Sequence, residues 1–400
     1  LEKMHLSIGS TNRTMLRSVV RTNASSLMSP AQRGFRSYAK SMSYAVPLGL
    51  EHGTGVEPGM FRIKTFNKIS EKGLQRFPAA FYEVSGDFED HSHAILLRSH
   101  KLQVDDVQVT CRAIARCGAG TNNVPVGEMT AMGIPVFNTP GANANAVKEL
   151  VLAGLLLASR DIVGGVQHMK TLGAEGTARE RVEKDKAMFG GREISGKTIG
   201  VVGLGHIGSA TARDAAALGM QVVGFDPGLT IQAALKLPRE TKLLSSVKAV
   251  LDASDYVSLN IPYIAKPPSE GGTKGIINSE LLEYMKPNAC LLNFARGELV
   301  DSADLQAWLN KPGVSGKYIT DFPDDLLWDH KNVVVIPHLG ASTEEAEDAA
   351  AAMAAETVMR FLTTGEVVNS VNFPETLLES RDAENTVKSC TLPPPAHMQW

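Results

Sequence analysis

The chain has 400 residues, 43% of them hydrophobic, and a formal net charge of −3. This length is more than one hydrophobic core usually holds, so we expect two domains. The near-neutral charge argues against nucleic acid or membrane partners, and no apolar run approaches the roughly 20 residues that a membrane-spanning helix needs. The four cysteines have no metal-binding spacing and are too few for a disulfide scaffold, so we expect no bound metal. The composition therefore favours a function with a small-molecule substrate.

Residues 1–50 have a composition of their own, because no acidic residue lies between Glu2 and Glu51. The arginines of this stretch, which lie among many serines, are Arg13, Arg17, Arg21, Arg33 and Arg36. Such a composition is typical of an organelle transit peptide, and a disordered basic tail is the alternative. The arginine density favours the mitochondrion, with a plastid or the cytoplasm as alternatives.

From about residue 61, short apolar runs alternate with helical stretches, which predicts α/β domains with parallel sheets and crossover helices. The strands expected in the first block are 61–66, 94–97, 113–116 and 135–138. Together they indicate a small doubly wound domain. The stretch 146–160 is apolar around most of its helical circumference, so we expect a buried helix that joins two domains or contacts a partner subunit.

A second block begins at Lys197, and its expected strands are 199–203, 222–226, 256–261, 290–295, 318–322 and 333–336. Six parallel strands fit a dinucleotide-binding sheet. A long closing helix is predicted from a capping box of Ser342 and Glu345 to about Leu362. The final stretch, 379–400, has little apolar periodicity, and we expect an irregular tail there.

The sequence GLGHIG at residues 203–208 follows an expected strand and precedes an alanine-rich helical stretch. The cofactor-binding residues expected in this loop are Gly203, Gly205, His206, Ile207 and Gly208. Gly203 allows a tight turn, Gly205 lets the backbone approach a pyrophosphate, and Gly208 permits close packing of helix on strand. A glycine-rich turn that serves packing alone is the alternative.

Asp226 ends the next expected strand, about 18 residues beyond the glycine loop, where the hydroxyls of a cofactor ribose should lie. A carboxylate at this place would repel the 2′-phosphate of NADP. The next residues, Pro227 and Gly228, provide no cation that could hold that phosphate. The sequence therefore predicts NAD as the cofactor.

In an open parallel sheet, ligands bind beyond the carboxyl ends of the strands. The further cofactor-binding residues expected there are Asn260, Pro262, Ala295, Asp321 and Gly340. His338 could take the hydroxyl proton of a 2-hydroxy acid as hydride leaves C2, and Arg296 could hold the substrate carboxylate and the developing carbonyl oxygen. The alternatives are a surface ion pair for Arg296 and a core or helix-cap role for His338.

The motifs GLGHIG, NFARGELVD and PHLGAST occur in this order and resemble those of the D-isomer-specific 2-hydroxy acid dehydrogenases. The resemblance covers roughly residues 60–375. The segments KTFNKIS, LLRSHKL, RCGAGTNNV, VFNTPGANANAVKEL and GEVVNSVNFPE are most similar to the phosphoglycerate dehydrogenase branch of this family. The resemblance thus implies NAD-dependent oxidation of 3-phosphoglycerate to 3-phosphohydroxypyruvate, the first step of phosphorylated serine biosynthesis.

The same resemblance implies a Rossmann NAD-binding domain inserted into a flavodoxin-like substrate domain, and a homodimer. The implied parts are a leader (1–50), the substrate domain (51–145 and 339–378), the NAD domain (146–338) and the tail (379–400). The substrate-binding residues that it implies, besides Arg296 and His338, are Arg98, Ser99, Gly120 and Asn122. Arg98 suits a phosphate, which needs a cation besides the one that holds the carboxylate. Arg116 is a second candidate, with a structural ion pair as its alternative.

Two departures from the family pattern concern mechanism and regulation. The family usually places a glutamate before the catalytic histidine, whereas the stretch ITDFPDDLLWDH contains none. We expect Asp325, or else Asp324, to take its place, and Asp321 to lie near the nicotinamide amide. About 25 residues follow NSVNFPE, fewer than a serine-binding regulatory domain needs, so we expect no feedback by serine through such a module.

Two other functions fit the same fold. A hydroxypyruvate or glyoxylate reductase of the family would need no phosphate site. A corepressor-like scaffold that senses NADH and binds partner proteins would need no working histidine. Turnover of phosphorylated and unphosphorylated substrates separates all three.

Overall fold

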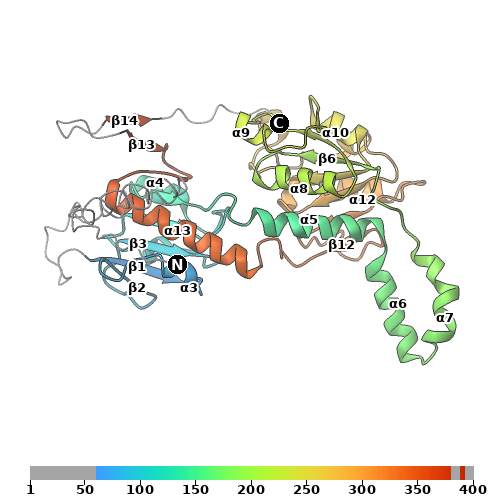
Figure 1. Ribbon diagram of the computed structural model, residues 1–400, viewed down its shortest axis with the longest axis horizontal. Helices are drawn as coiled ribbons and strands as arrows, with labels where there is room; N and C mark the ends of the chain where they lie inside the picture. Colours follow the sequence, from blue (N-terminus) through green and yellow to red (C-terminus); the bar gives the residue numbers. More distant parts are fainter. Residues whose placement is uncertain (1–59, 380–387, 392–400) are drawn as a thin grey trace, which may run out of the picture. The chain divides into compact units, whose positions relative to one another are not determined.

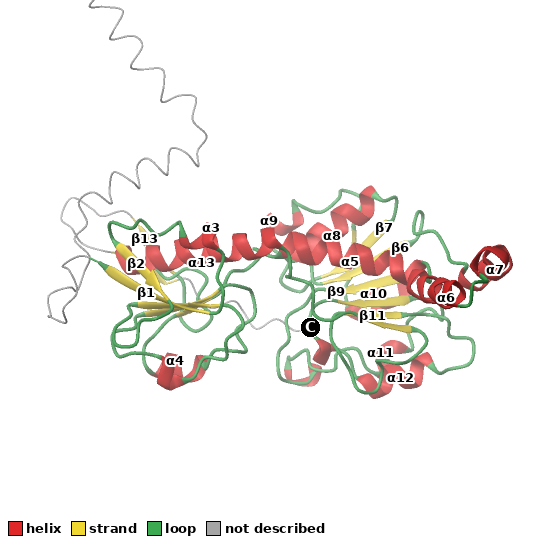
Figure 2. Ribbon diagram, turned by 90° about the horizontal axis from the view of Figure 1, so that it is seen from below, coloured by secondary structure: helices red, strands yellow, loops and turns green. Residues whose placement is uncertain are grey.

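The computed structural model describes residues 60–379 and 388–391. The elements below belong to one compact unit that begins at Phe61, and the predicted leader, 1–50, lies outside the described residues. Two parallel sheets, each with helices packed against it, make up most of this unit (Figures 1 and 2). Among the described helices, none is long and apolar enough to cross a membrane.

The first sheet has five parallel strands in the order β2-β1-β3-β4-β5, which is the flavodoxin-like order. Its strands are β1 (Phe61–Phe66), β2 (Tyr82–Ser85), β3 (Ala94–Leu97), β4 (Ala113–Arg116) and β5 (Val136–Phe137). Its helical connections are α3 (Glu71–Leu74), η1 (Val104–Asp106) and α4 (Val126–Ala131). Four of the strands were predicted, and β2 is an additional edge strand.

The predicted closing helix, α13 (Glu344–Thr364), packs against the first sheet and α3. The predicted capping box is wrong by one residue. The chain is still extended at Thr343, and its hydroxyl, not that of Ser342, accepts the Ala346 N–H at 3.2 Å. A Cβ on Gly73 of α3 would lie 2.3 Å from the Ala351 Cβ, so this glycine permits the close approach of the two helices.

The second sheet has seven parallel strands in the order β12-β11-β10-β9-β6-β7-β8, which extends the Rossmann order by one strand. The strands are β6 (Thr198–Val202), β7 (Gln221–Phe225), β8 (Lys242–Leu243), β9 (Tyr256–Leu259), β10 (Cys290–Asn293), β11 (Tyr318–Thr320) and β12 (Val333–Val335). The helices among them are α8 (His206–Ala217), α9 (Ile231–Ala234), α10 (Val247–Ala253), η3 (Pro268–Glu270), α11 (Ser279–Leu282), η4 (Gly297–Leu299) and α12 (Ser302–Leu309). Six of the strands were predicted, and the exposed edge strand β8 was not.

The predicted linking helix is α5 (Ala144–Ser159), and it packs against α8, β10 and β11 of the second sheet. Val151 and Leu155 are fully buried there, while Leu156 points outward and is 46% exposed. Three further elements follow, α6 (Ile162–Ala174), α7 (Ala178–Asp185) and η2 (Lys186–Phe189), with α6 and α7 side by side. The Asp185 carboxylate ties them together, 2.8 Å from His168 Nε2 and 2.9 Å from Arg181 Nη2.

The expectation of an irregular tail over 379–400 is wrong for its described residues, Glu379 and 388–391, which belong to two paired strands. Strand β13 (Thr376–Glu379) pairs antiparallel with β14 (Lys388–Thr391). This pairing uses backbone hydrogen bonds, which need no apolar periodicity, so the sequence pattern gave no sign of it. The domain boundaries remain predictions.

Candidate active site

The glycine loop between β6 and α8 has the geometry that its three glycines predict. Gly203 has φ 89°, and a Cβ there would lie 2.6 Å from the carbonyl oxygen of Asn260. A Cβ on Gly208 would lie 1.9 Å from the Gly203 carbonyl oxygen, so this position requires glycine for helix and strand to pack. Gly205 faces open space and precedes the exposed His206 at the start of α8. The free N–H groups of this helix end can therefore receive a phosphate.

Asp226 follows β7 and organises the same loop. One carboxylate oxygen accepts the Leu204 N–H at 2.8 Å, and the other accepts the Gly228 N–H at 2.8 Å. The half-buried carboxylate thus joins the glycine loop to the turn after β7 and remains beside the place where a ribose would lie. Ile207 is half-buried against the core below.

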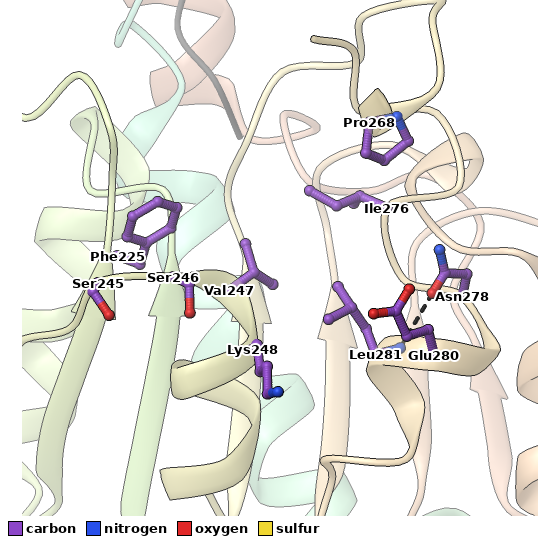
Figure 3. Close-up of a pocket in the computed structure, with 10 residues that line it drawn as sticks. All are labelled: Phe225, Ser245, Ser246, Val247, Lys248, Pro268, Ile276, Asn278, Glu280 and Leu281. Carbon is purple, nitrogen blue, oxygen red and sulfur yellow. Dashed lines mark hydrogen bonds between the residues drawn. The ribbon is translucent and has the colours of Figure 1, made fainter. Parts of the chain in front are cut away.

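A cavity of about 350 Å³ lies next to this edge of the sheet, beside Phe225. Figure 3 shows Phe225 and Val247 on one side of it and Ile276 and Leu281 on the other. Ser246 and Asn278 also line it, but their side chains cap α10 and α11. The other lining residues include Ser245, Lys248 and Glu280, so apolar and polar groups share the walls. No single motif indicates this cavity, because its residues come from four separate segments.

The next strand ends place the other expected cofactor residues at the same edge. Asn260 after β9 donates to Ser258 Oγ at 3.0 Å, and the Pro262 carbonyl accepts the Thr273 hydroxyl at 2.7 Å. Ala295 after β10 donates its N–H to Asn293 Oδ1 at 3.2 Å. Together with the glycine loop and Asp226, these groups fit a dinucleotide such as NAD.

Arg296 follows Ala295 and reaches a loop of the first sheet. Its Nη1 donates to the Ala295 carbonyl at 2.6 Å, and Asn293 holds the Arg296 carbonyl at 2.9 Å. A Cβ on Gly120 would lie 2.6 Å from Arg296 Nη2 and 3.6 Å from Asn122 Oδ1. Glycine at position 120 therefore leaves room for the guanidinium, and the predicted residues Arg296, Gly120 and Asn122 lie together.

Arg116 lies close enough to both Arg296 and Arg98 for their charges to interact. Burial lowers the pKa of Arg116, and the charges of Arg296 and Arg98 act in the same direction, against an opposing effect of Cys117. Arg98 is about one third exposed and pairs with Glu347 of α13 at 2.7 Å. Arg116 therefore has a cation near it on either count, and such guanidinium groups suit an anion with more than one negative charge.

The loop that carries Arg98 and the exposed Ser99 is held from three sides. Asn67 Oδ1 accepts the N–H groups of Ser99 at 3.2 Å and His100 at 2.6 Å. The Arg98 carbonyl accepts Asn123 Nδ2 at 3.1 Å and Arg116 Nε at 3.1 Å. Arg116 therefore has a structural role besides its charge. Asn67, Asn123 and Glu347 were not predicted, because their contacts join segments that are far apart in the sequence.

His338 follows β12 and is exposed. Its backbone has φ 53°, in the left-handed region that residues with a side chain seldom adopt. Its ring contacts Phe322 edge-on, with ring centroids 5.0 Å apart. Within the described part of the chain, no carboxylate hydrogen-bonds to this ring.

No hydrogen bond joins Asp325 to His338 in the described residues, and the expectation that Asp325 orients the histidine stays a prediction. Asp325 is exposed. Asp324 accepts the Ser302 hydroxyl and the Leu326 N–H. Asp321 lies closer and accepts the backbone N–H groups of Leu339 and Gly340, each at 2.7 Å.

A family model described as the D-isomer specific 2-hydroxyacid dehydrogenase NAD binding domain matches residues 153–340. The D-3-phosphoglycerate dehydrogenase of Bacillus subtilis (strain 168) is 32% identical over 331 residues, which cover 79% of this chain and 59% of the relative. The protein of that name from Mycobacterium tuberculosis (strain H37Rv) is 38% identical over 266 residues, 65% of this chain and 47% of the relative. The chain thus spans about half the length of these two relatives.

Two solved structures share the fold, each over 78% of this chain. The NAD⁺-bound 3-phosphoglycerate dehydrogenase of Entamoeba histolytica is 22% identical with a TM-score of 0.61 over 99% of its chain. D-2-hydroxyisocaproate dehydrogenase is 21% identical with a TM-score of 0.62 over 100% of its chain.

The D-3-phosphoglycerate dehydrogenase of Dictyostelium discoideum is 30% identical over 300 residues, 72% of this chain and 68% of the relative. With this coverage, the chain belongs to the D-isomer specific 2-hydroxyacid dehydrogenase family.

Proposed function

We propose that this chain oxidises 3-phosphoglycerate to 3-phosphohydroxypyruvate with NAD. The observation that carries the proposal is that Arg116 lies within electrostatic range of both Arg98 and Arg296, and that Arg296 follows one of the strand ends that fit a dinucleotide. A substrate with a carboxylate and a phosphate carries about three negative charges near neutral pH and needs several cations. The names of the relatives from Bacillus, Mycobacterium and Dictyostelium support the same substrate.

Each group has a defined task in this reaction. Arg296 would hold the carboxylate and the oxygen on C2, and Arg98 and Arg116 would receive the phosphate. His338 would take the proton of the C2 hydroxyl, so that the C2 oxygen becomes a carbonyl. Bound NAD supplies the acceptor for the hydride that leaves C2. Loss of Arg296 or His338 should therefore affect kcat, whereas loss of Arg98 should act mainly through KM.

The test is reduction of NAD measured with 3-phosphoglycerate and with D-glycerate, which lacks the phosphate. We expect the wild type to prefer 3-phosphoglycerate by roughly 10- to 100-fold in kcat/KM, because a charged hydrogen bond contributes about 1.5–3 kcal/mol. Arg98→Ala should remove most of this preference and leave turnover of D-glycerate little changed. Equal turnover of both substrates, or faster reduction of hydroxypyruvate or glyoxylate, would identify the chain as a reductase of the same family. Binding of NADH without any turnover would favour the scaffold function.

We also propose that two copies of the chain associate through α6 and its neighbours. Ile162, Val163, Val166 and Met169 follow a helical spacing and are each 40–50% exposed. Met188 of η2, 69% exposed, adds to this apolar surface. Isolated exposed apolar residues are common, but a row of them along one helix face is typical of a subunit interface. Light scattering should give the mass of a dimer, and Val166→Glu should give a monomer with an unchanged circular dichroism spectrum. A monomeric wild type would reject this interface.

We further propose that residues 1–50 direct the protein to mitochondria, because an arginine- and serine-rich stretch without acidic residues is typical of such leaders. Fusion of residues 1–59 to a fluorescent protein should give mitochondrial fluorescence. A fusion with the five arginines replaced by alanine is the control and should stay in the cytoplasm. Plastid fluorescence, or no difference between the two fusions, would reject the proposal.

A further inference from the structure

One residue, Asp321, holds the loop that carries His338. Its carbonyl oxygen accepts the His338 N–H at 3.1 Å. Its carboxylate accepts the next two N–H groups, from Leu339 through Oδ1 and from Gly340 through Oδ2, both at 2.7 Å. The His338 N–H also lies 3.0 Å from the Ile336 carbonyl oxygen, so the carboxylate itself receives the two N–H groups of Leu339 and Gly340. We call this arrangement the Asp321 clamp.

The clamp accounts for the unusual backbone of the loop. The left-handed conformation of His338, with φ 53°, is unfavourable for a residue with a Cβ and persists only where its surroundings enforce it. A Cβ on Gly340 would lie 3.1 Å from Asp321 Oδ2, so a side chain there would press on the carboxylate. Asp321 itself is 1% exposed. The loop and the carboxylate thus fit each other closely.

Among the residues that the structure describes, no acid hydrogen-bonds to the His338 ring. A histidine that acts as a base is usually aligned by a third group that hydrogen-bonds to its far nitrogen. Here Asp324 is engaged by Ser302 and Leu326, and Asp325 is exposed. The ring contact with Phe322 is apolar. The alignment of His338 must then come from its backbone.

We propose that Asp321 is the positioning residue of His338, and that it acts through the backbone clamp in place of a carboxylate on the ring. This inference rests on the proposed function, in which His338 takes the hydroxyl proton. The buried negative charge also favours the imidazolium that forms at that moment, because opposite charges attract more strongly away from water. Asp321 thereby serves the proton transfer without touching the substrate.

A double-mutant cycle tests the route of this effect. Asp321→Asn keeps the shape but turns an N–H donor towards one of the two backbone N–H groups, so kcat should fall roughly 10- to 100-fold, as for a small misplacement of a catalytic group. In a His338→Gln background, the same change should alter the residual rate by less than about twofold. An undiminished effect in the His338→Gln background would overturn the proposal. The exposed Asp329→Asn is the matched control and should behave as the wild type.

A second measurement tests the clamp without turnover. Amide hydrogen exchange of the loop at residues 338–342 should be at least about tenfold faster in Asp321→Asn than in the wild type. Unchanged exchange would show that the carboxylate does not hold the loop and would overturn the proposal. The cycle is run with whichever 2-hydroxy acid the wild type oxidises. If the wild type oxidises another 2-hydroxy acid but not 3-phosphoglycerate, the proposed substrate is rejected. The double-mutant cycle with that other substrate still tests the role of Asp321.

Discussion

Asp226 and Asp321 occupy matching places in the second sheet, yet they are used differently. Each follows a parallel strand, and each accepts two backbone N–H groups with its two carboxylate oxygens. Asp226 holds the glycine loop and is half-buried at the cofactor edge. Asp321 holds the His338 loop and is 1% exposed. We therefore expect the same arrangement to serve cofactor recognition where the carboxylate remains accessible, and loop alignment where it does not.

The difference lies in what each carboxylate has left to offer. A carboxylate has about four sites that can accept hydrogen bonds, so two backbone donors leave capacity for a ligand. At Asp226 this capacity faces the side on which a ribose would lie. At Asp321 it lies beneath the histidine loop. We therefore expect changes at the first residue to affect affinity for the cofactor and changes at the second to affect catalysis.

The largest effect should come from the residue that the clamp positions. His338→Gln removes the group that takes the hydroxyl proton, and we expect kcat to fall about 100- to 10,000-fold, the usual contribution of a general base. The Kd for NADH, measured by fluorescence titration, should hardly change. A loss of NADH affinity as large as the loss in kcat would place His338 on the cofactor side and break the contrast between the two aspartates.

A smaller and different effect is expected at the other carboxylate. Asp226→Ala should raise the KM for NAD roughly 10- to 100-fold, because a charged hydrogen bond contributes about 1.5–3 kcal/mol. It should change kcat little and weaken the preference for NAD over NADP, because the repulsion of a 2′-phosphate is gone. Steady-state kinetics with both cofactors measures these changes. An unchanged ratio of kcat/KM for NAD and NADP would show that Asp226 has a structural role only, like that of Asp321.

A third carboxylate extends the contrast to the substrate side. Glu347 holds the side chain of Arg98 at 2.7 Å, and both groups are about one third exposed. Such a pair is weak, contributing about 0–1 kcal/mol, so an incoming phosphate can displace it. Glu347→Gln should lower the KM for 3-phosphoglycerate by up to about fivefold at low salt, because a competing anion is removed. The KM for D-glycerate should stay the same. A higher KM for 3-phosphoglycerate would mean that Glu347 aligns Arg98 rather than competing for it.

The sequence predicted those parts of the fold that bury long apolar runs. Strands β1, β3 and β4 have the expected bounds, whereas the edge strands β2 and β8 were missed because edge strands bury little surface and β8 is only two residues long. The glycine loop and Asp226 were recognisable because their spacing is local in the sequence. Spatial pairings such as Arg98 with Glu347 could not be predicted, because nothing in either segment points to the other. Asp325 was chosen by its position before His338, and the structure shows it exposed and without a hydrogen bond to the histidine.

The smallest effect concerns stability and pH at Asp321. Burial raises the pKa of Asp321 above its ordinary value of 3.8, although the N–H groups of Leu339 and Gly340 and the nearby His338 oppose this. A carboxyl with a raised pKa binds its proton more readily in the folded than in the unfolded state. As the pH falls through that raised pKa towards 3.8, folding should therefore become more favourable in the wild type relative to Asp321→Asn. Urea unfolding of both proteins at a series of pH values measures the difference. A difference independent of pH would show that the pKa of the Asp321 carboxyl is not raised by its burial.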